Sequence, residues 1–164
     1  MGELKKLCPI IMGSEKDLGH AEKMREGLDR FGIGYAFRVA SAHKHPDYLR
    51  VIVDEYKSVD GTLLVYVTVA GRQDALTNTL TGMTRYPVIG CPPDARADAD
   101  ILSSLHRPSG ITSALILNPG DVGLEAAKYM ALADRELAAE IERYQAELRR
   151  EIEEVDRKLR ELRG

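Results

Sequence analysis

Residues 62–69 read TLLVYVTV, a run of eight residues in which six are large and apolar. Branched and aromatic side chains of this kind favour β-strands. A run without polar alternation is typical of a strand that is buried on both faces, as in a parallel sheet. The loop that follows, AGRQDA at 70–75, turns abruptly small and polar. The stretch therefore predicts a central parallel strand with a polar loop at its carboxyl end.

Four other apolar runs extend this pattern along the chain. They are LCPIIM at 7–12, YAFRV at 35–39, PVIGC at 87–91 and SALILN at 113–118. Segments with helical periodicity separate the first four runs, and alternation of strand and helix implies right-handed crossovers with helices on both faces of the sheet. We therefore predict a doubly wound α/β sandwich with a five-stranded parallel sheet.

Three helices are expected between the first four strands. The first has apolar residues at spacings of three and four from Leu18 to Phe31 and ends at Gly32. The second begins at Pro46, with Tyr48, Ile52 and Tyr56 on one face. The third covers roughly 75–83, where the threonines of TNTLTG lower helix propensity, so tertiary contacts must hold it.

A long amphipathic helix is predicted over residues 134–164. Its apolar positions recur every three or four residues from Leu137 to Leu162, and Glu, Arg and Lys fill the other faces. At 1.5 Å per residue the helix reaches about 40 Å, longer than a small domain can cover. It lies along its own domain or, as we favour, also contacts a neighbouring subunit. Residues 1–164 are expected to form a single domain.

The composition excludes several classes of protein. The 164 residues carry a net charge of -3, which argues against a nucleic-acid interface, since that requires a basic face. No segment approaches the roughly 20 apolar residues of a membrane span. Cys8 and Cys91 lie inside apolar runs, which fits reduced core thiols in a cytoplasmic protein.

Parallel sheets bind ligands beyond the carboxyl ends of their strands, so the loops there are candidate site segments. MGSEKD, SAHKHP, AGRQDA and CPPD all emerge at that edge. In the first loop, Ser14 and the start of a helix can hold a phosphate or a sugar hydroxyl. Capping of that helix by Ser14 or Asp17 is the structural alternative.

The SAHKHP loop at 41–46 places a hydroxyl, an imidazole and an ammonium within four residues. Ser41 and Lys44 suit a phosphate, and His43 suits proton transfer near neutral pH. A His-x-His metal pair is the rival interpretation, but no third ligand lies nearby in the sequence. We expect His20 to be structural and His45 to be peripheral.

In the AGR segment, Ala70 and Gly71 allow a ligand to approach the backbone closely. Arg72 adds planar donors that suit a carboxylate or phosphate. A salt bridge from Arg72 to Asp74 or to a helix end is the alternative. Cys91 has no base beside it in the sequence and is expected to be an unreactive core thiol.

Taken in order, these motifs resemble the PurE family of purine biosynthesis across about residues 7–133. The residues that carry the resemblance are MGSEKDLGHAEK, SAHKHPD, VAGRQDAL, PVIGCPP and SSLHRPSG. GHAEK, Lys44 and the AGR segment resemble the class II branch, the aminoimidazole ribonucleotide (AIR) carboxylases. The class I mutase loop, GGAAHLPG, is missing, since no histidine occurs between His45 and His106.

The resemblance implies a flavodoxin-like three-layer sandwich and a homo-oligomer, often of eight subunits, with a tetramer as the alternative. It also implies carboxylation of AIR by CO2 to 4-carboxy-AIR without metal, biotin, ATP or any other cofactor. His43 would accept the proton from carbon 4, while backbone donors at Ala70 and Gly71 would hold CO2. The substrate-binding residues implied are Gly13, Ser14, Asp17, Ser41, Ala42, Lys44, Ala70, Gly71 and Arg72.

The chain departs from the class II pattern at four positions. Gln73 and Asp74 replace Ser and Asn of AGRSN, and His106 and Arg107 replace Arg and an apolar residue before PSG. Three other functions therefore stay open. They are the class I mutase, a related carboxylase of another heterocycle, and a non-catalytic nucleotide-binding or scaffold protein that acts through its terminal helix.

Overall fold

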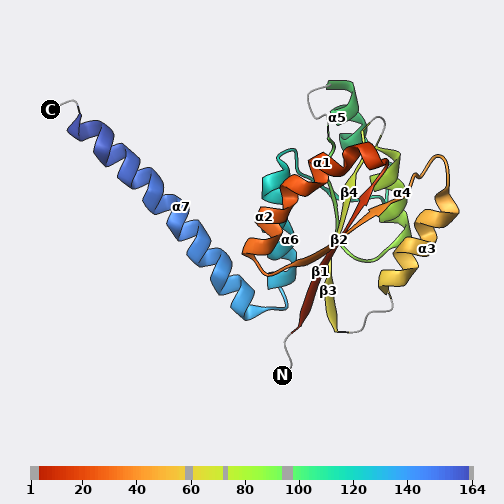
Figure 1. Ribbon diagram of the computed structural model, residues 1–164, viewed down its shortest axis with the longest axis horizontal. Coiled ribbons are helices and arrows are strands. Elements are labelled where there is room, and N and C mark those ends of the chain that lie inside the picture. Colours follow the sequence, from red (N-terminus) through yellow and green to blue (C-terminus); the bar gives the residue numbers. More distant parts are fainter. Residues whose placement is uncertain (1–3, 58–60, 72–73, 94–97, 163–164) are drawn as a thin grey trace.

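The computed structural model describes residues 4–57, 61–71, 74–93 and 98–162, without the side chains of residues 98–100 (Figure 1). Its strands are β1 (Lys5–Met12), β2 (Gly34–Val39), β3 (Thr62–Leu64), β4 (Tyr66–Val69), β5 (Val88–Gly90) and β6 (Ala114–Leu115). All pairings are parallel, in the order β2-β1-β4-β5-β6, with β3 also on β1. This order reverses between β1 and β4, so the sheet is doubly wound.

The predicted strand at 62–69 is interrupted once. Strands β3 and β4 lie on either side of Val65, and both pair with β1. The Val65 N–H still donates to the Leu7 carbonyl at 3.2 Å, so the two pieces follow one line across the sheet. The six strands therefore occupy the five predicted positions, although β6 is only two residues long where six were predicted.

The helices are α1 (Leu18–Ala21), α2 (Arg25–Arg30), α3 (Pro46–Lys57), α4 (Ala75–Met83), α5 (Asp98–Leu105), α6 (Val122–Ala131) and α7 (Arg135–Glu161). The described residues also form three 3₁₀ turns: η1 (Glu15–Asp17) before α1, η2 (Glu22–Met24) between α1 and α2, and η3 (Pro119–Asp121) before α6. The first predicted helix is thus α1, η2 and α2 in succession, and it stops before Gly32, where φ is +59°. Within the described ranges, no helix is both long and apolar enough to cross a bilayer.

Two apolar layers flank the sheet, which gives the predicted three-layer, flavodoxin-like arrangement. Helices α1, α2 and α6 and the start of α7 cover one face, and α3 and α4 cover the other (Figure 1). Ile10 and Val67 pack toward the first layer, while Ile11 and Tyr66 pack toward the second. Alternate residues of each central strand therefore pack into the apolar layers on opposite faces of the sheet.

The prediction of the apolar face of α3 is partly wrong. Leu49, Ile52 and Val53 are its buried residues, whereas the side chain of Tyr48 is 44% exposed. Tyr48 instead lies against the ring of His45, with 5.6 Å between ring centroids. The buried stripe follows the i, i+3, i+4 pattern from Leu49, and one residue earlier is rotated out of it by about 100°.

Helices α2 and α6 cross at two glycines. A Cβ on Gly123 would lie 2.1 Å from the carbonyl carbon of Gly27, and a Cβ on Gly27 would lie 2.5 Å from the carbonyl oxygen of Gly120. Real Cβ atoms do not approach backbone so closely. The absence of side chains at both positions therefore allows α6 to reach the sheet beside α2.

Candidate functional site

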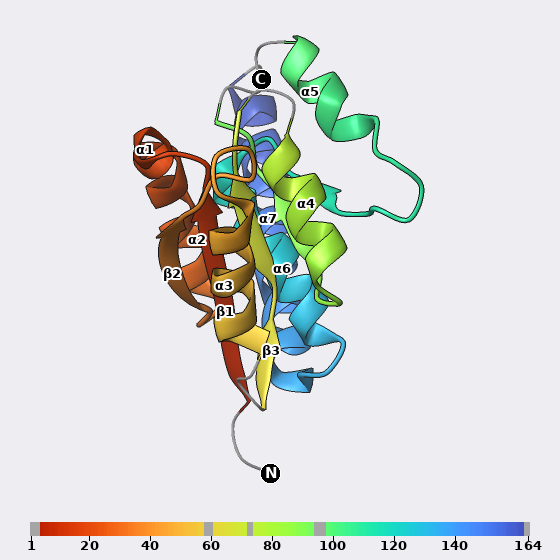
Figure 2. The ribbon, with the colours of Figure 1, turned by 90° about the vertical axis from the view of Figure 1, so that its right-hand side faces the viewer.

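The loops that follow β1, β2 and β4 begin side by side at the carboxyl edge of the sheet (Figure 2). The Ala40 N–H donates to the Met12 carbonyl, and the Gly13 N–H donates to the Val69 carbonyl, each at 2.9 Å. These backbone bonds continue the ladders of β1 with its neighbours by one residue. They bring SAHKHP and AGR to either side of the MGS segment, as the strand order predicts.

Two further close approaches link the loop after β1 to the loop after β4, and the loop after β4 to the loop after β5. A Cβ on Gly13 would lie 3.5 Å from the Cβ of Ala70, and a Cβ on Gly71 would lie 3.9 Å from Cγ of Pro93. Gly13, Ala70 and Gly71 are therefore close neighbours, are half-buried and carry little or no side chain. A small or planar ligand can approach the main chain there.

The SAHKHP segment forms a hydrogen-bonded turn that leads into α3. Ser41 Oγ accepts from the Lys44 N–H at 3.3 Å, and the Ser41 carbonyl accepts from the His45 N–H at 2.9 Å. His45 Nδ1 accepts from the Tyr48 N–H at 3.3 Å and so caps α3. Ser41 and His45 thus build the turn, and Pro46 starts the helix after it.

His43 and Lys44 occupy the exposed part of that turn, and Ala42 is half-buried beside them. Among the described residues, neither the His43 imidazole nor the Lys44 ammonium makes a hydrogen bond or ion pair. A base and a cation are therefore presented together on a short, hydrogen-bonded scaffold. Such a pair can bind an anion and transfer a proton.

Ser14 acts as a helix cap in this structure. Its Oγ accepts from the Lys16 N–H at 3.2 Å and so caps η1, as the structural alternative predicts. Because a hydroxyl both accepts and donates, its proton can still reach an anion. Asp17 lies half-buried at the start of α1, although its carboxylate does not cap that helix.

Cys91 lies directly after β5 and is fully buried. Burial raises the pKa of its thiol to about 12, so the thiol stays protonated at neutral pH and is not a nucleophile. The prediction of a core thiol is confirmed. Although no base flanks Cys91 in the sequence, the fold places His20 Nε2 3.4 Å from its Sγ.

Asp74 is a buried carboxylate that the sequence indicated as a departure from a family pattern and as a possible partner of Arg72. Its side chain is 3% exposed, and its backbone is left-handed, with φ of 42°. Oδ1 accepts from Thr77 Oγ1, which lies 2.7 Å from Thr68 Oγ1, while Oδ2 has no partner within the described residues. Asp74 therefore ties the start of α4 to β4, and an aspartate just before a helix start was the available signal.

Arg72 lies outside the described residues, as does Gln73. The expected contact of Arg72 with a ligand and its alternative, a salt bridge to Asp74, both stay predictions.

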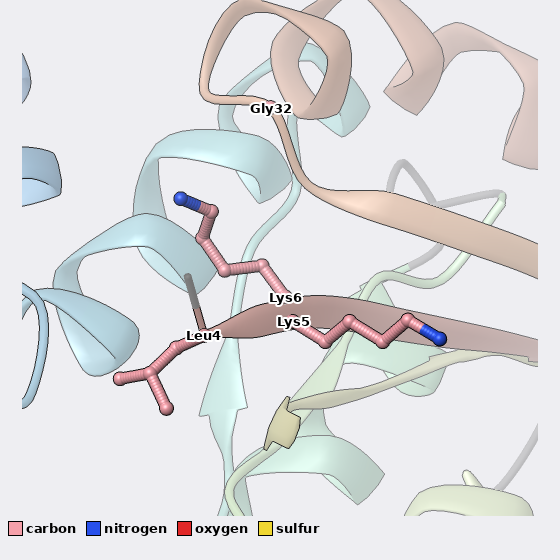
Figure 3. A pocket seen from close by; sticks show the side chains of 4 residues that line it. All are labelled: Leu4, Lys5, Lys6 and Gly32. Carbon is pink, nitrogen blue, oxygen red and sulfur yellow. The ribbon is translucent and has the colours of Figure 1, made fainter. Parts of the chain in front are cut away.

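A shallow pocket of about 290 Å³ lies at the other end of β1, lined by Leu4, Lys5, Lys6 and Gly32 (Figure 3). Lys6 and Lys5 point to opposite sides of the strand there (Figure 3). Lys6 Nζ is 3.2 Å from Asp134 Oδ2, and Asp134 Oδ1 caps α7 by accepting from the N–H groups of Glu136 and Leu137. This end of the molecule therefore anchors α7 and contributes nothing to the carboxyl edge.

The chain is similar to known proteins over most of its length. The family model described as AIR carboxylase matches residues 7–151. A phosphoribosylaminoimidazole carboxylase of Treponema denticola is 42% identical over 96% of this chain and 99% of its own. An N5-carboxyaminoimidazole ribonucleotide mutase of Methanocaldococcus jannaschii is 34% identical over 93% of this chain and 97% of its own.

The fold of the chain also matches that of a solved structure. The crystal structure of Treponema denticola PurE superposes with a TM-score of 0.89 at 42% identity, covering 94% of this chain and 99% of that one. Sequence and fold therefore match together over nearly the whole length of both chains. The chain belongs to the AIR carboxylase family, the PurE family of purine biosynthesis.

Proposed function

We propose that the protein joins AIR and CO2 to form 4-carboxy-AIR, reversibly, and that the reaction needs neither ATP nor a metal. The observation that carries the proposal is the turn after β2. Its own hydrogen bonds use Ser41 and His45, so it presents the His43 imidazole and the Lys44 ammonium beside the β1 loop. The family to which the chain belongs supplies the reaction class.

In this reaction carbon 4 of the electron-rich aminoimidazole attacks the carbon of CO2. A carbon–carbon bond forms, one C=O π pair moves to oxygen, and carbon 4 becomes tetrahedral. Loss of the proton on carbon 4 restores the aromatic ring, and His43 is the base that accepts it. In the reverse direction the imidazolium returns that proton, and CO2 leaves.

Substrate binding follows from the charges and donors of the three loops. Lys44 and the hydroxyls of Ser14 and Ser41 hold the phosphate, and Asp17 accepts from the ribose hydroxyls. The half-buried, small residues Gly13, Ala42, Ala70 and Gly71 belong to the proposed site because CO2 has few polar groups for side chains to bind. Backbone donors beside carbon 4 are suited to hold it for attack.

The first prediction concerns the carboxyl donor. Purified protein supplied with AIR and bicarbonate, without ATP, should form 4-carboxy-AIR, which ultraviolet absorbance detects. Supplied with the N5-carboxy isomer of AIR, it should form product only as fast as that isomer releases AIR and CO2. Product formed from the N5-carboxy isomer alone would reassign the protein as a class I mutase.

The mutase is the second candidate because one relative with that name aligns along almost the full chain. Both reactions need a base at the position of His43, so the histidine does not separate them. The AGR segment and the missing AHLPG loop favour the carboxylase. Activity with neither AIR nor its isomer would point to another heterocycle as substrate.

We also propose that the enzyme is a cytoplasmic homo-oligomer. Leu102 and Leu105 of α5 are 52% and 61% exposed, and the distal part of α7 exposes further apolar residues. Exposed apolar patches of this kind mark protein interfaces. The free, buried thiols of Cys8 and Cys91 fit a reducing compartment.

The second prediction tests the contribution of α7 to assembly. Deletion of residues 148–164 should leave the domain folded, because the side chains of residues 148–161 are all exposed and do not belong to its core. The oligomer should become less stable, seen as a lower mass by light scattering on dilution. An unchanged mass and melting temperature would show that the distal helix takes no part in assembly.

A further inference from the structure

One apolar stripe runs the length of α7, but only its first part is covered. Leu137 and Ile141 are 1% and 8% exposed, and Tyr144 packs edge-on against Phe31 at 5.6 Å between centroids. The exposed residues of the stripe are Leu148 (40%), Ile152 (72%), Val155 (56%), Leu159 (58%) and Leu162 (82%). Figure 1 shows this distal part leading away from α2 and α6.

The distal apolar residues follow a heptad pattern. Their spacing from Leu148 to Leu162 is 4, 3, 4 and 3, the repeat of the two core positions of a coiled coil. The spacing from Ile141 to Ile152 is 3, 4 and 4, so the register changes where the helix leaves the domain. The distal segment is therefore patterned to pair with another helix, while the proximal segment is patterned to lie on the domain.

The charges beside this stripe specify the direction of pairing. Glu151 and Lys158 flank it on one side, and Arg149 and Asp156 flank it on the other. Two parallel copies in register would place Glu151 against Asp156 of the second copy, a pair of like charges. Two antiparallel copies would place Glu151 against Lys158 and Arg149 against Asp156, so each flanking pair is attractive.

We propose that residues 148–159 of α7 pair with the same segment of a second copy of this chain as an antiparallel two-stranded coiled coil. In this register Ile152 lies against Val155 of the second copy, and Leu148 lies against Leu159. The pairing covers Leu148, Ile152, Val155 and Leu159, which the domain leaves exposed, whereas Leu162 lies beyond the paired segment. The inference is independent of the proposed reaction, since it concerns only α7.

Engineered disulfides distinguish the antiparallel arrangement from its alternatives. A disulfide needs Cα atoms about 4.4–6.8 Å apart, and residues 148 and 159 of one helix are separated by roughly 16 Å along its axis. The Leu148→Cys/Leu159→Cys double variant should therefore form covalent dimers on mild oxidation. Leu148→Cys and Leu159→Cys alone should not. The native Cys8 and Cys91 are fully buried and do not interfere.

Charge reversal tests the same register. In the double-cysteine background, Glu151→Lys should slow cross-linking about tenfold, because each copy then places a lysine against Lys158. Adding Lys158→Glu restores opposite charges and should restore the rate. Glu153→Lys makes the same charge change on the opposite face of the helix and should have no effect.

Cross-linking of either single-cysteine variant would overturn the proposal in favour of parallel pairing, for which Glu151→Lys should also speed association. The absence of cross-linking in all three cysteine variants would overturn it in favour of packing on the body of another subunit. Circular dichroism of each variant shows whether the domain remains folded. Activity with AIR is measured separately and decides only the proposed reaction.

Discussion

Replacing His43 by asparagine should lower the turnover number roughly a hundredfold to ten-thousandfold, the range that general acid–base catalysis contributes. Asparagine keeps polarity and approximate size but has no titratable base. His43 is exposed, and its ring makes no hydrogen bond among the described residues, so the variant should fold normally. The rate of 4-carboxy-AIR decarboxylation, followed by ultraviolet absorbance, measures the effect.

Binding separates the role of His43 from that of Lys44. In His43→Asn, the affinity for 4-carboxy-AIR should change by less than about tenfold, or 1.4 kcal/mol, since Ser14, Ser41 and Lys44 remain. Lys44→Ala should show the reverse, with weaker binding as the main effect. Near-normal decarboxylation by His43→Asn would contradict the assignment of the base. His45 would then be the next candidate, although its Nδ1 accepts from the Tyr48 N–H.

Gly123→Ala should lower the free energy of unfolding by about 3 kcal/mol, the upper end of the usual cost of overpacking. The added methyl would lie 2.1 Å from the carbonyl carbon of Gly27, and backbone cannot rotate away as a side chain can. The two helices must therefore separate. For a domain of this size the melting temperature should fall by roughly 6–12 °C.

Gly19→Ala is the matched control for this substitution. Gly19 lies in α1, and a Cβ there would meet nothing within 4 Å. Alanine in a helix is favoured over glycine by roughly 0.5–1 kcal/mol, so this variant should be as stable as the parent or slightly more stable. Equal melting temperatures for Gly123→Ala and the parent would show that α2 and α6 do not pack as closely as described.

The elements that could be predicted are those with strong local signals. The apolar run at 62–69, Pro46 at the start of α3 and the range of α4 all correspond to the structure. The prediction that tertiary contacts hold the threonine-rich helix is confirmed, because Thr77 is buried and bonds to Thr68 and Asp74. Gly90 contributes, since a Cβ there would lie 3.2 Å from Thr77 Oγ1.

Helices α5 and α6 were not predicted because neither has a strong apolar stripe. In α5 the large apolar residues, Ile101, Leu102 and Leu105, are confined to its last five positions. In α6 the buried stripe consists largely of Gly123, Ala126 and Ala127, which add little hydrophobic signal. Both helices depend on tertiary context.

The candidate site was predictable as a set of loops but not in its supporting contacts. The strand order alone brings the loops after β1, β2 and β4 together. The contact of His20 with Cys91 joins residues 71 positions apart, and the buried carboxylate of Asp74 depends on a left-handed backbone. Neither feature produces a periodic pattern in the sequence. The sequence therefore shows which residue types are present but not that they are buried or in contact.

The most direct test of the account follows the origin of the new carboxylate carbon. Protein incubated with AIR and ¹³C-labelled bicarbonate, without ATP, should yield 4-carboxy-AIR in which the carboxylate bonded to carbon 4 carries the label, as read by ¹³C nuclear magnetic resonance. His43→Asn should give little labelled product in the same time. Unlabelled AIR recovered unchanged, while the N5-carboxy isomer is converted with its own carboxylate retained, would contradict carboxylation by CO2.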